Sequence, residues 1–248
     1  MKIKEVYDFL DFFAPFKNQL DFDNAGFLIG DINAEVKGIV VTLDITDEVI
    51  KFAINKNANL IITHHPVIFE PLKSVLSDSL VFSLIKNDIN VISAHTNLDM
   101  AQGGVNDKLC EIIGLENIEG VFQNGEVYEA RIGTISETDA DTFAKYLKEK
   151  LGGMIKYTKG ADKIKTVGIC SGSGGSMLYD MAKLGVDAFV TADIKHNILL
   201  DAEHLNIAIF DCGHFNTEDI IVSPIKNKLE EKFHMPTFEF HSDIIKSI

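Results

Sequence analysis

The chain has 248 residues, of which 46% are hydrophobic and 24% charged, so an ordinary globular fold with a substantial core is expected. Its 37 acidic and 23 basic residues give a formal net charge of -14, which no cluster of Lys or Arg interrupts. This balance disfavours nucleic acid as a partner. No apolar run approaches the ~18 residues of a membrane span, and three widely separated cysteines predict reduced thiols. We therefore expect a cytoplasmic protein without a membrane segment.

Strand and helix patterns alternate along most of the chain. Residues 1–14 predict an amphipathic helix that ends before Pro15, rather than a signal peptide. The β-branched runs and helical patterns that follow predict βαβ units around a parallel sheet. Strands are expected at 36–44, 58–66, within 89–99, and at 127–135, 154–159, 164–170, 186–193, within 206–218 and at 237–240. Helices are expected at 45–57, 78–88, 107–113, 136–153, 173–185, 193–205 and 218–233.

Two long stretches share one plan. Residues 36–65 and 164–193 each read strand, polar turn, helix, strand and polar residues, and each is followed by a further helix and a strand that leads to a histidine. The sequence therefore predicts an α/β fold of two similar lobes with mostly parallel or mixed sheets. We expect the lobes at residues 1–125 and 126–248, with the C-terminal segment able to pack back on the first lobe.

Metal-binding residue types gather where the predicted strands end. In open α/β sheets, ligands bind beyond the carboxyl ends of the strands. Five of the eight histidines fall there, and carboxylates accompany them. The residues concerned are His64, His65, His95, Asp99, Asp193, His196, His214 and Glu218. Imidazole together with carboxylate suits zinc, iron or manganese.

Spacing suggests how these residues divide between ions. Adjacent side chains on an extended segment point to opposite sides, so His64 and His65 are expected to serve two ions. His214 and Glu218, four residues apart, would share one helix face. The hypothesis is a dinuclear site in the cleft between the lobes. His64 and Asp99 bind one ion, His65 and His214 bind the other, and Glu218 is shared. Two dications with two carboxylates leave about +2, which would attract a phosphate-bearing substrate.

Each of these residues has a plainer alternative. A single histidine at a strand end is more often a hydrogen-bonded turn residue, and only the joint pattern favours metal. His95, four residues before Asp99, is expected to orient that ligand, and Asp193 and His196 could simply begin a helix or line the pocket wall. His95 and His196 are nevertheless the candidates for catalytic proton transfer. His204, His234 and His241 are expected to face solvent.

Three further polar motifs stay open between function and turn formation. The glycine-rich stretch 170–177, CSGSGGSM, either cradles a phosphate at a helix N-terminus or forms a tight β-to-α turn. Residues 21–31, DFDNAGFLIGD, have the composition of a turn. Asp44 follows a strand beside threonines and is a helix cap as readily as a catalytic base.

Taken in order, these motifs resemble a known family. DFDNAGFLIGD, THHP (63–66), HTNLD (95–99), TADIKH (191–196) and GHFNTE (213–218) are similar to the Nif-three-like family, whose bacterial members carry the name GTP cyclohydrolase I type 2 homologue. The likeness runs essentially end to end. It implies two α/β lobes, a ring-shaped homohexamer and two metal ions at the five ligands chosen above. Phe22, Asn197 and Phe215 depart from the usual family residues, which are Trp, His and Tyr.

These observations lead to two functional expectations. The first is a metal-dependent hydrolase, similar to a GTP cyclohydrolase, in which two divalent ions activate water against a small nucleotide-like substrate. The alternative is a non-enzymatic metal-binding or metal-handling protein that acts through oligomeric assembly and partners.

Overall fold

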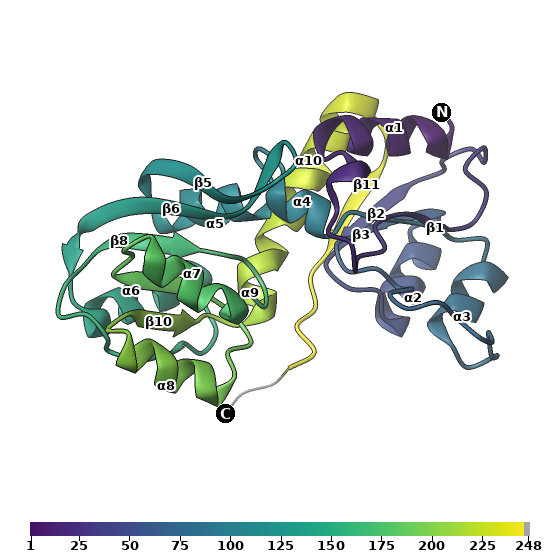
Figure 1. Cartoon of the computed structure of the whole chain (residues 1–248). Helices are drawn as coiled ribbons and strands as arrows, with labels where there is room; N and C mark the ends of the chain where they lie inside the picture. Colours follow the sequence, from purple (N-terminus) through teal and green to yellow (C-terminus); the bar gives the residue numbers. More distant parts are fainter. Residues whose placement is uncertain (246–248) are drawn as a thin grey trace. The chain divides into compact units, whose positions relative to one another are not determined.

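The computed structural model describes residues 1–245, which divide into two compact α/β units (Figure 1). Unit 1 contains residues 1–101 and 221–244, and unit 2 contains residues 102–220 with Ile245. The expected lobe boundary at residue 125 lies within unit 2, in the turn of a β-hairpin. The C-terminal helix and strand belong to unit 1, so the chain passes from unit 1 to unit 2 and back.

Unit 1 is built on a five-stranded sheet in the order β1-β4-β3-β2-β11. Its strands are β1 (Gly26–Ile29), β2 (Ile39–Thr42), β3 (Leu60–Thr63), β4 (Asn90–Ser93) and β11 (Thr237–Phe240). All neighbouring pairs are parallel except β1 with β4. Its helices are α1 (Ile3–Phe13), η1 (Phe16–Asn18), α2 (Asp47–Asn55), α3 (Leu80–Lys86), α4 (Thr96–Met100) and α10 (Val222–Phe233).

Helices cover both faces of the unit 1 sheet (Figure 1). Alternate strand residues such as Val40 and Ile61 pack against α2 and α3. Val41 and Ile62 face the other way, toward Leu10 of α1 and Ile225 of α10. Every residue of β2, β3 and β4 is buried, which is why these strands read as continuous apolar runs instead of alternating patterns.

Unit 2 is built on a six-stranded mixed sheet in the order β5-β6-β8-β9-β10-β7. Its strands are β5 (Glu116–Asn124), β6 (Val127–Thr138), β7 (Lys156–Tyr157), β8 (Ile164–Ile169), β9 (Ala188–Thr191) and β10 (Ala208–Asp211). Its helices are α5 (Val105–Ile113), α6 (Ala140–Leu151), η2 (Gly175–Met177), α7 (Leu178–Lys183), α8 (His196–His204) and α9 (His214–Glu218). A short turn, η3 (Asp219–Ile221), follows α9.

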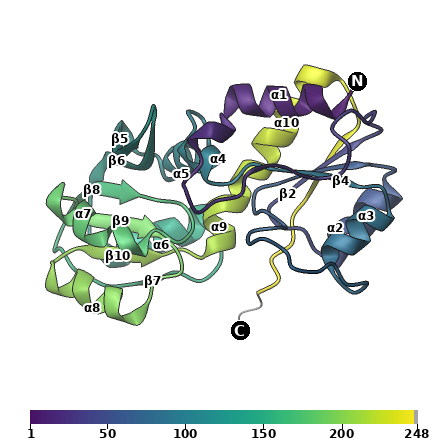
Figure 2. The same cartoon turned by 45° about the vertical axis from the view of Figure 1, so that its right-hand side comes forward.

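The shared sequence plan is confirmed by the two sheets. Strands β2-β3-β4 of unit 1 and β8-β9-β10 of unit 2 are both parallel runs of adjacent strands joined by helices. In unit 2, α5 and α6 pack on one face through residues such as Leu109 and Phe143. The other face packs against α7 and α8 through Met181 and Ala202 (Figure 2).

The sequence pattern did not predict two strands, β1 and β5. β1 lies in the stretch that composition marks as a turn, and its antiparallel pairing with β4 has a bulge between Phe27 and Ile29. β5 pairs with β6 as a hairpin, but its residues are mostly exposed, so it lacks the apolar run that marks a buried strand. Within residues 1–245, no helix is long and apolar enough to cross a membrane. All three cysteines are buried thiols, and burial raises the pKa of Cys110 to about 12.

Phe210 gives a direct test of the unit 2 core. Its ring is fully buried, with its centroid 5.2 Å from that of Phe143 and 5.6 Å from that of Tyr157. Phe210→Ala is expected to lower the free energy of unfolding by about 3–5 kcal/mol, because it removes apolar contacts and leaves a cavity. Leu200→Ala, on an exposed side chain of the same unit, should change it by less than about 0.5 kcal/mol in the same urea titration.

Candidate metal-binding site

The parallel strands of unit 1 end in register, and polar residues follow each end. Thr42 pairs with Thr63, and Thr63 pairs with Ser93, as the last residues of β2, β3 and β4. Three segments leave this edge of the sheet together, and they carry Asp44, the two histidines of THHP and His95. The convergence expected from the sequence therefore occurs within unit 1.

The two histidines of THHP lie in a bend after β3. The Thr63 hydroxyl donates to the carbonyl oxygen of Leu43 at 2.8 Å, and the Ser93 hydroxyl donates to that of His64 at 2.9 Å. The ring centroids of His64 and His65 are 5.1 Å apart. One ring nitrogen each of His64, His65 and His95 lies within 4.8 Å of the other two. The two side chains therefore do not point to opposite sides, because alternation of side chains ends with the strand, and their assignment to two ions stays a prediction.

All three imidazoles are held through Nδ1 by an oxygen acceptor. His64 Nδ1 lies 2.8 Å from the carbonyl oxygen of Ala94, and His65 Nδ1 lies 2.7 Å from Asp44 Oδ1. His95 Nδ1 lies 2.7 Å from Asp23 Oδ1. Carbonyl and carboxylate oxygens only accept, so Nδ1 is the donor in each case. In the neutral rings the lone pair is then on Nε2, which is the ring nitrogen that could bind a metal.

Asp99 lies beside His64. It occupies the short helix α4, and its Oδ1 is 3.4 Å from His64 Nε2. The helix is fixed by its neighbours in the HTNLD motif, since the Asn97 amide donates to the carbonyl oxygen of Ala14 and the Thr96 hydroxyl accepts from the backbone N–H of Leu20. The predicted pairing of a histidine and a carboxylate at this position is present in unit 1.

Asp23 belongs to this histidine cluster, although no sequence pattern indicated it. Its side chain is fully buried and accepts hydrogen bonds from His95 and from the backbone N–H and hydroxyl of Thr96. Burial raises the pKa of this carboxyl, but the bonds from His95 and Thr96 outweigh it and hold the pKa at about 2. The stretch DFDNAG, which composition marks as a turn, thus anchors His95 as well.

Unit 2 presents a second histidine and carboxylate pair. His214 begins α9 and Glu218 ends it, and His214 Nε2 lies 2.9 Å from Glu218 Oε2, as the spacing predicted. His214 Nδ1 lies 2.6 Å from Asp193 Oδ2. Asp193 follows β9 in a left-handed conformation with φ of 52°. A fourth imidazole is therefore held through Nδ1, as the three imidazoles of unit 1 are.

The backbone of the glycine-rich stretch after β8 packs closely against the side chain of Glu218. Gly172 has φ of 57°, and a Cβ added there would lie 2.0 Å from Glu218 Oε1. The backbone N–H of Gly172 donates to the hydroxyl of Thr217, and that of Gly174 donates to the hydroxyl of Thr191. These amides are used inside the protein, so the structure favours the tight turn over the phosphate cradle for this stretch.

The remaining predicted residues take simpler positions. His196 is exposed as the first residue of α8, and Asn197 is exposed beside it. The three histidines expected to face solvent do so: His204, His234 and His241. Thr46 caps α2 by accepting from the backbone N–H of Val49, which leaves Asp44 to hold His65.

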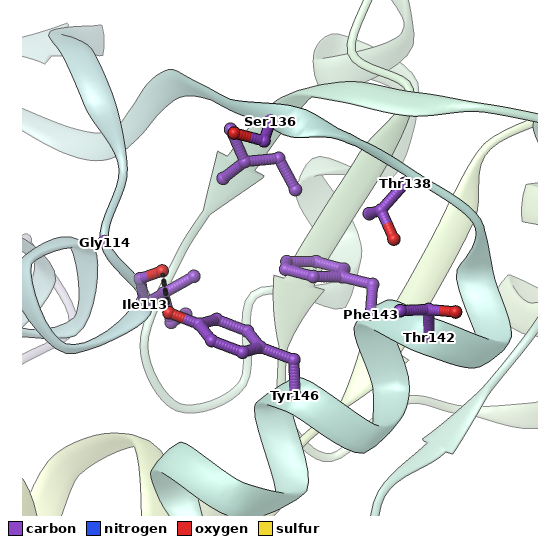
Figure 3. A pocket seen from close by; sticks show the side chains of 8 residues that line it. Ile113, Gly114, Ser136, Thr138, Thr142, Phe143 and Tyr146 are labelled. Carbon is purple, nitrogen blue, oxygen red and sulfur yellow. Dashed lines mark hydrogen bonds between the residues drawn. The ribbon is translucent and has the colours of Figure 1, made fainter.

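Unit 2 also has a cavity of about 320 Å³ that contains none of the predicted site residues (Figure 3). Its lining is apolar with hydroxyl groups, and the Tyr146 hydroxyl donates to the carbonyl oxygen of Ile113 at 3.0 Å. The lining residues are Ile113, Gly114, Ile135, Ser136, Thr138, Thr142, Phe143 and Tyr146. With neither imidazole nor carboxylate in its lining, this cavity is no candidate for a metal ion.

Comparison with known proteins agrees with the motifs. The profile of the family described as Duf34/NIF3 (NGG1p interacting factor 3) matches residues 1–247. The chain belongs to this family. A Clostridium acetobutylicum relative named GTP cyclohydrolase 1 type 2 homolog is 36% identical over 245 residues, covering 94% of this chain and 91% of the relative.

Solved structures of similar proteins have the same fold. A Staphylococcus aureus hypothetical protein aligns with a TM-score of 0.93 and 29% identity, covering 100% of this chain and 99% of its own. Reduced HcgD from Methanocaldococcus jannaschii aligns with a TM-score of 0.84 and 27% identity, covering 96% and 97%. The fold and the family are thereby established, and function rests on the residues described above.

The buried Asp23 carboxylate predicts a dependence of stability on pH. Its folded pKa of about 2 lies below the ordinary 3.8, so the ionised group stabilises the fold at all pH values above about 4 and this contribution is lost as the pH falls toward 2. Asp23→Asn is expected to lower the free energy of unfolding by about 2 kcal/mol at pH 6 and by much less at pH 2.

Urea titrations at the two pH values measure this difference. Asp21→Asn, at an exposed carboxylate two positions away, is the control and should leave stability unchanged at both. An equal loss for Asp23→Asn at pH 6 and pH 2 would contradict the role assigned to its ionised form.

Proposed function

We propose that the chain is a metal-dependent hydrolase that binds two divalent ions and acts on a small nucleotide-like substrate. The observation that carries this proposal is that four imidazoles are held through the same ring nitrogen. His64, His65, His95 and His214 are each held through Nδ1 by an oxygen acceptor. Metal-binding histidines are typically oriented in this way. The joint pattern of four such rings, and not any one of them, supports the proposal.

Distances within each unit fit metal coordination. Ligand atoms about 2.0–2.1 Å from a tetrahedral ion lie roughly 3.4 Å apart, and those of an octahedral ion roughly 3.0 Å apart. His64 Nε2 and Asp99 Oδ1 are 3.4 Å apart, and His214 Nε2 and Glu218 Oε2 are 2.9 Å apart. Both pairs therefore fit neighbouring ligands of one ion.

The division of ligands between two ions follows from the sequence spacing. His64 and Asp99 would hold one ion, His65 and His214 would hold the other, and Glu218 would be shared. The group chemistry favours zinc, iron or manganese, because imidazole and carboxylate are ligands common to all three.

Bound divalent ions would supply a water of lowered pKa and polarise the electrophile of the substrate. The chain's own residues supply the rest. The buried Asp23 fixes the ring of His95. Nε2 of this ring can accept a proton or donate one to the substrate. His196 at the start of α8 is the second candidate for proton transfer.

Relatives and composition support the remaining parts of the proposal. The relatives' name, GTP cyclohydrolase 1 type 2 homolog, agrees with a nucleotide-like substrate that bears phosphate. The buried thiols favour the cytoplasm. We propose that the active form is a homohexamer, as the family resemblance implies.

Elemental analysis of the purified protein tests the metal site. We expect about two equivalents of transition metal per chain, and a sharp loss in the double variant His64→Ala, Glu218→Ala because each proposed ion loses a ligand. Metal-free protein, or undiminished metal in the variant, would refute the dinuclear site.

A matched pair of glycine variants tests the position of Glu218 without removing a ligand. Gly172→Ala should lower the metal content because its Cβ would displace Glu218. Gly175→Ala, in the same turn, has only Ile198 Cγ2 at 3.8 Å and should retain the metal. Circular dichroism of both variants checks that the fold is kept.

Turnover by the metal-loaded protein separates the hydrolase from the metal-handling alternative. We expect metal-dependent hydrolysis of GTP or another member of a nucleotide panel, and a fall in kcat of about 100-fold or more in His95→Gln with unchanged metal content. If no nucleotide is turned over faster than by the His64→Ala, Glu218→Ala variant, a non-enzymatic metal-handling function replaces the hydrolase.

A further inference from the structure

Two exposed phenylalanine rings lie next to the histidine cluster of unit 1. Phe22 and Phe69, which we call the aromatic pair, are 63% and 43% exposed. Their ring centroids are 6.3 Å apart, and the Phe69 ring lies edge-on to His95 at 6.2 Å. The His95 ring in turn contacts those of His64 and His65. A continuous row of rings thus runs from solvent to the proposed ligands.

Hydrogen bonds from neighbouring residues fix the two loops that carry the aromatic pair. Phe22 precedes Asp23, which binds His95 and Thr96. The Asn24 amide donates to the carbonyl oxygen of Ile68 at 2.6 Å, and Ile68 precedes Phe69. The loop of Phe22 is therefore tied both to the histidine cluster and to the loop of Phe69. Large exposed apolar rings cost little entropy on binding when their loops are already fixed.

We propose that the aromatic pair binds a planar heteroaromatic ring of the substrate by stacking. This inference rests on the proposed function, and it assigns Phe22 and Phe69 as residues that determine substrate specificity. Stacking on aromatic side chains tolerates different bases, because every base has a π face. The pair therefore selects ligands that have a ring over ligands that have only phosphate, and it does not select one base over another.

The charge next to an ion held by the unit 1 histidines favours recognition through the ring. Asp23, Asp44 and Asp99 contact the imidazoles of unit 1 and bring three negative charges. One dication held there would bring two positive charges, so these groups leave no positive surplus to attract a phosphate, and the uncharged stacking contact gains importance.

Binding measurements on the metal-loaded full chain test this inference. The probes are GTP, ATP and inorganic triphosphate, which has similar phosphate charge but no ring. The wild type should bind both nucleotides roughly tenfold or more tightly than triphosphate. Phe22→Leu and Phe69→Leu should each reduce this preference severalfold, whereas Phe69→Tyr, which keeps the aromatic face, should retain it.

The control is Phe12→Ala, an exposed phenylalanine of α1 in the same unit, which should leave the preference unchanged. Equal affinity of the wild type for nucleotides and triphosphate, including no binding of any probe, overturns the inference, as does an undiminished preference in both leucine variants. If the leucine variants instead change the mass of the assembly and keep the preference, the pair belongs to an interface. Metal content and turnover, measured separately, report whether the proposed function itself fails.

Discussion

Burial of both sheet faces is the constraint on which this molecule depends. Helices cover both faces of each sheet, and every residue of β2, β3 and β4 in unit 1 and of β9 and β10 in unit 2 is buried. Polar chemistry is consequently confined to the segments that follow the strands. Because neighbouring strands are parallel and end in register, those segments leave one edge of the sheet together. The packing that stabilises the core also gathers the imidazoles.

The segments at these edges are ordered by hydrogen bonds among themselves. Asp44 follows one strand of unit 1 and holds a histidine that follows the next, and Asp193 and His214 have the same relation in unit 2. The acceptor in each case fixes the tautomer and the direction of the ring. A ligand set oriented before an ion arrives loses less conformational entropy when it binds, which favours affinity. The repeated sequence plan of the two halves thus has a counterpart in the chemistry of their loops.

Sequence periodicity was sufficient for the fold class, for most elements and for the position of His64 and His65 directly after a strand. It failed where tertiary contacts decide. The divergence expected for His64 and His65 assumed that the strand continues, whereas hydroxyl groups of two neighbouring strands stabilise a bend. Asp23 was missed because its partner, His95, is 72 positions away, and no local pattern indicates such a pairing. β5 was missed because an exposed hairpin strand has no apolar run to detect.

The same limits bear on electrostatics. From the sequence, the charge of the site is counted from the proposed metal ligands alone. On that count, the bound ions give the site a positive charge within a chain whose net charge is -14. In the structure, carboxylates also hold the imidazoles, and they add negative charge next to any bound cations. Orientation of the ligands and attraction of an anionic substrate are therefore opposing demands on one set of residues. Contacts that do not depend on charge, such as stacking on exposed aromatic rings, satisfy the second demand without weakening the first.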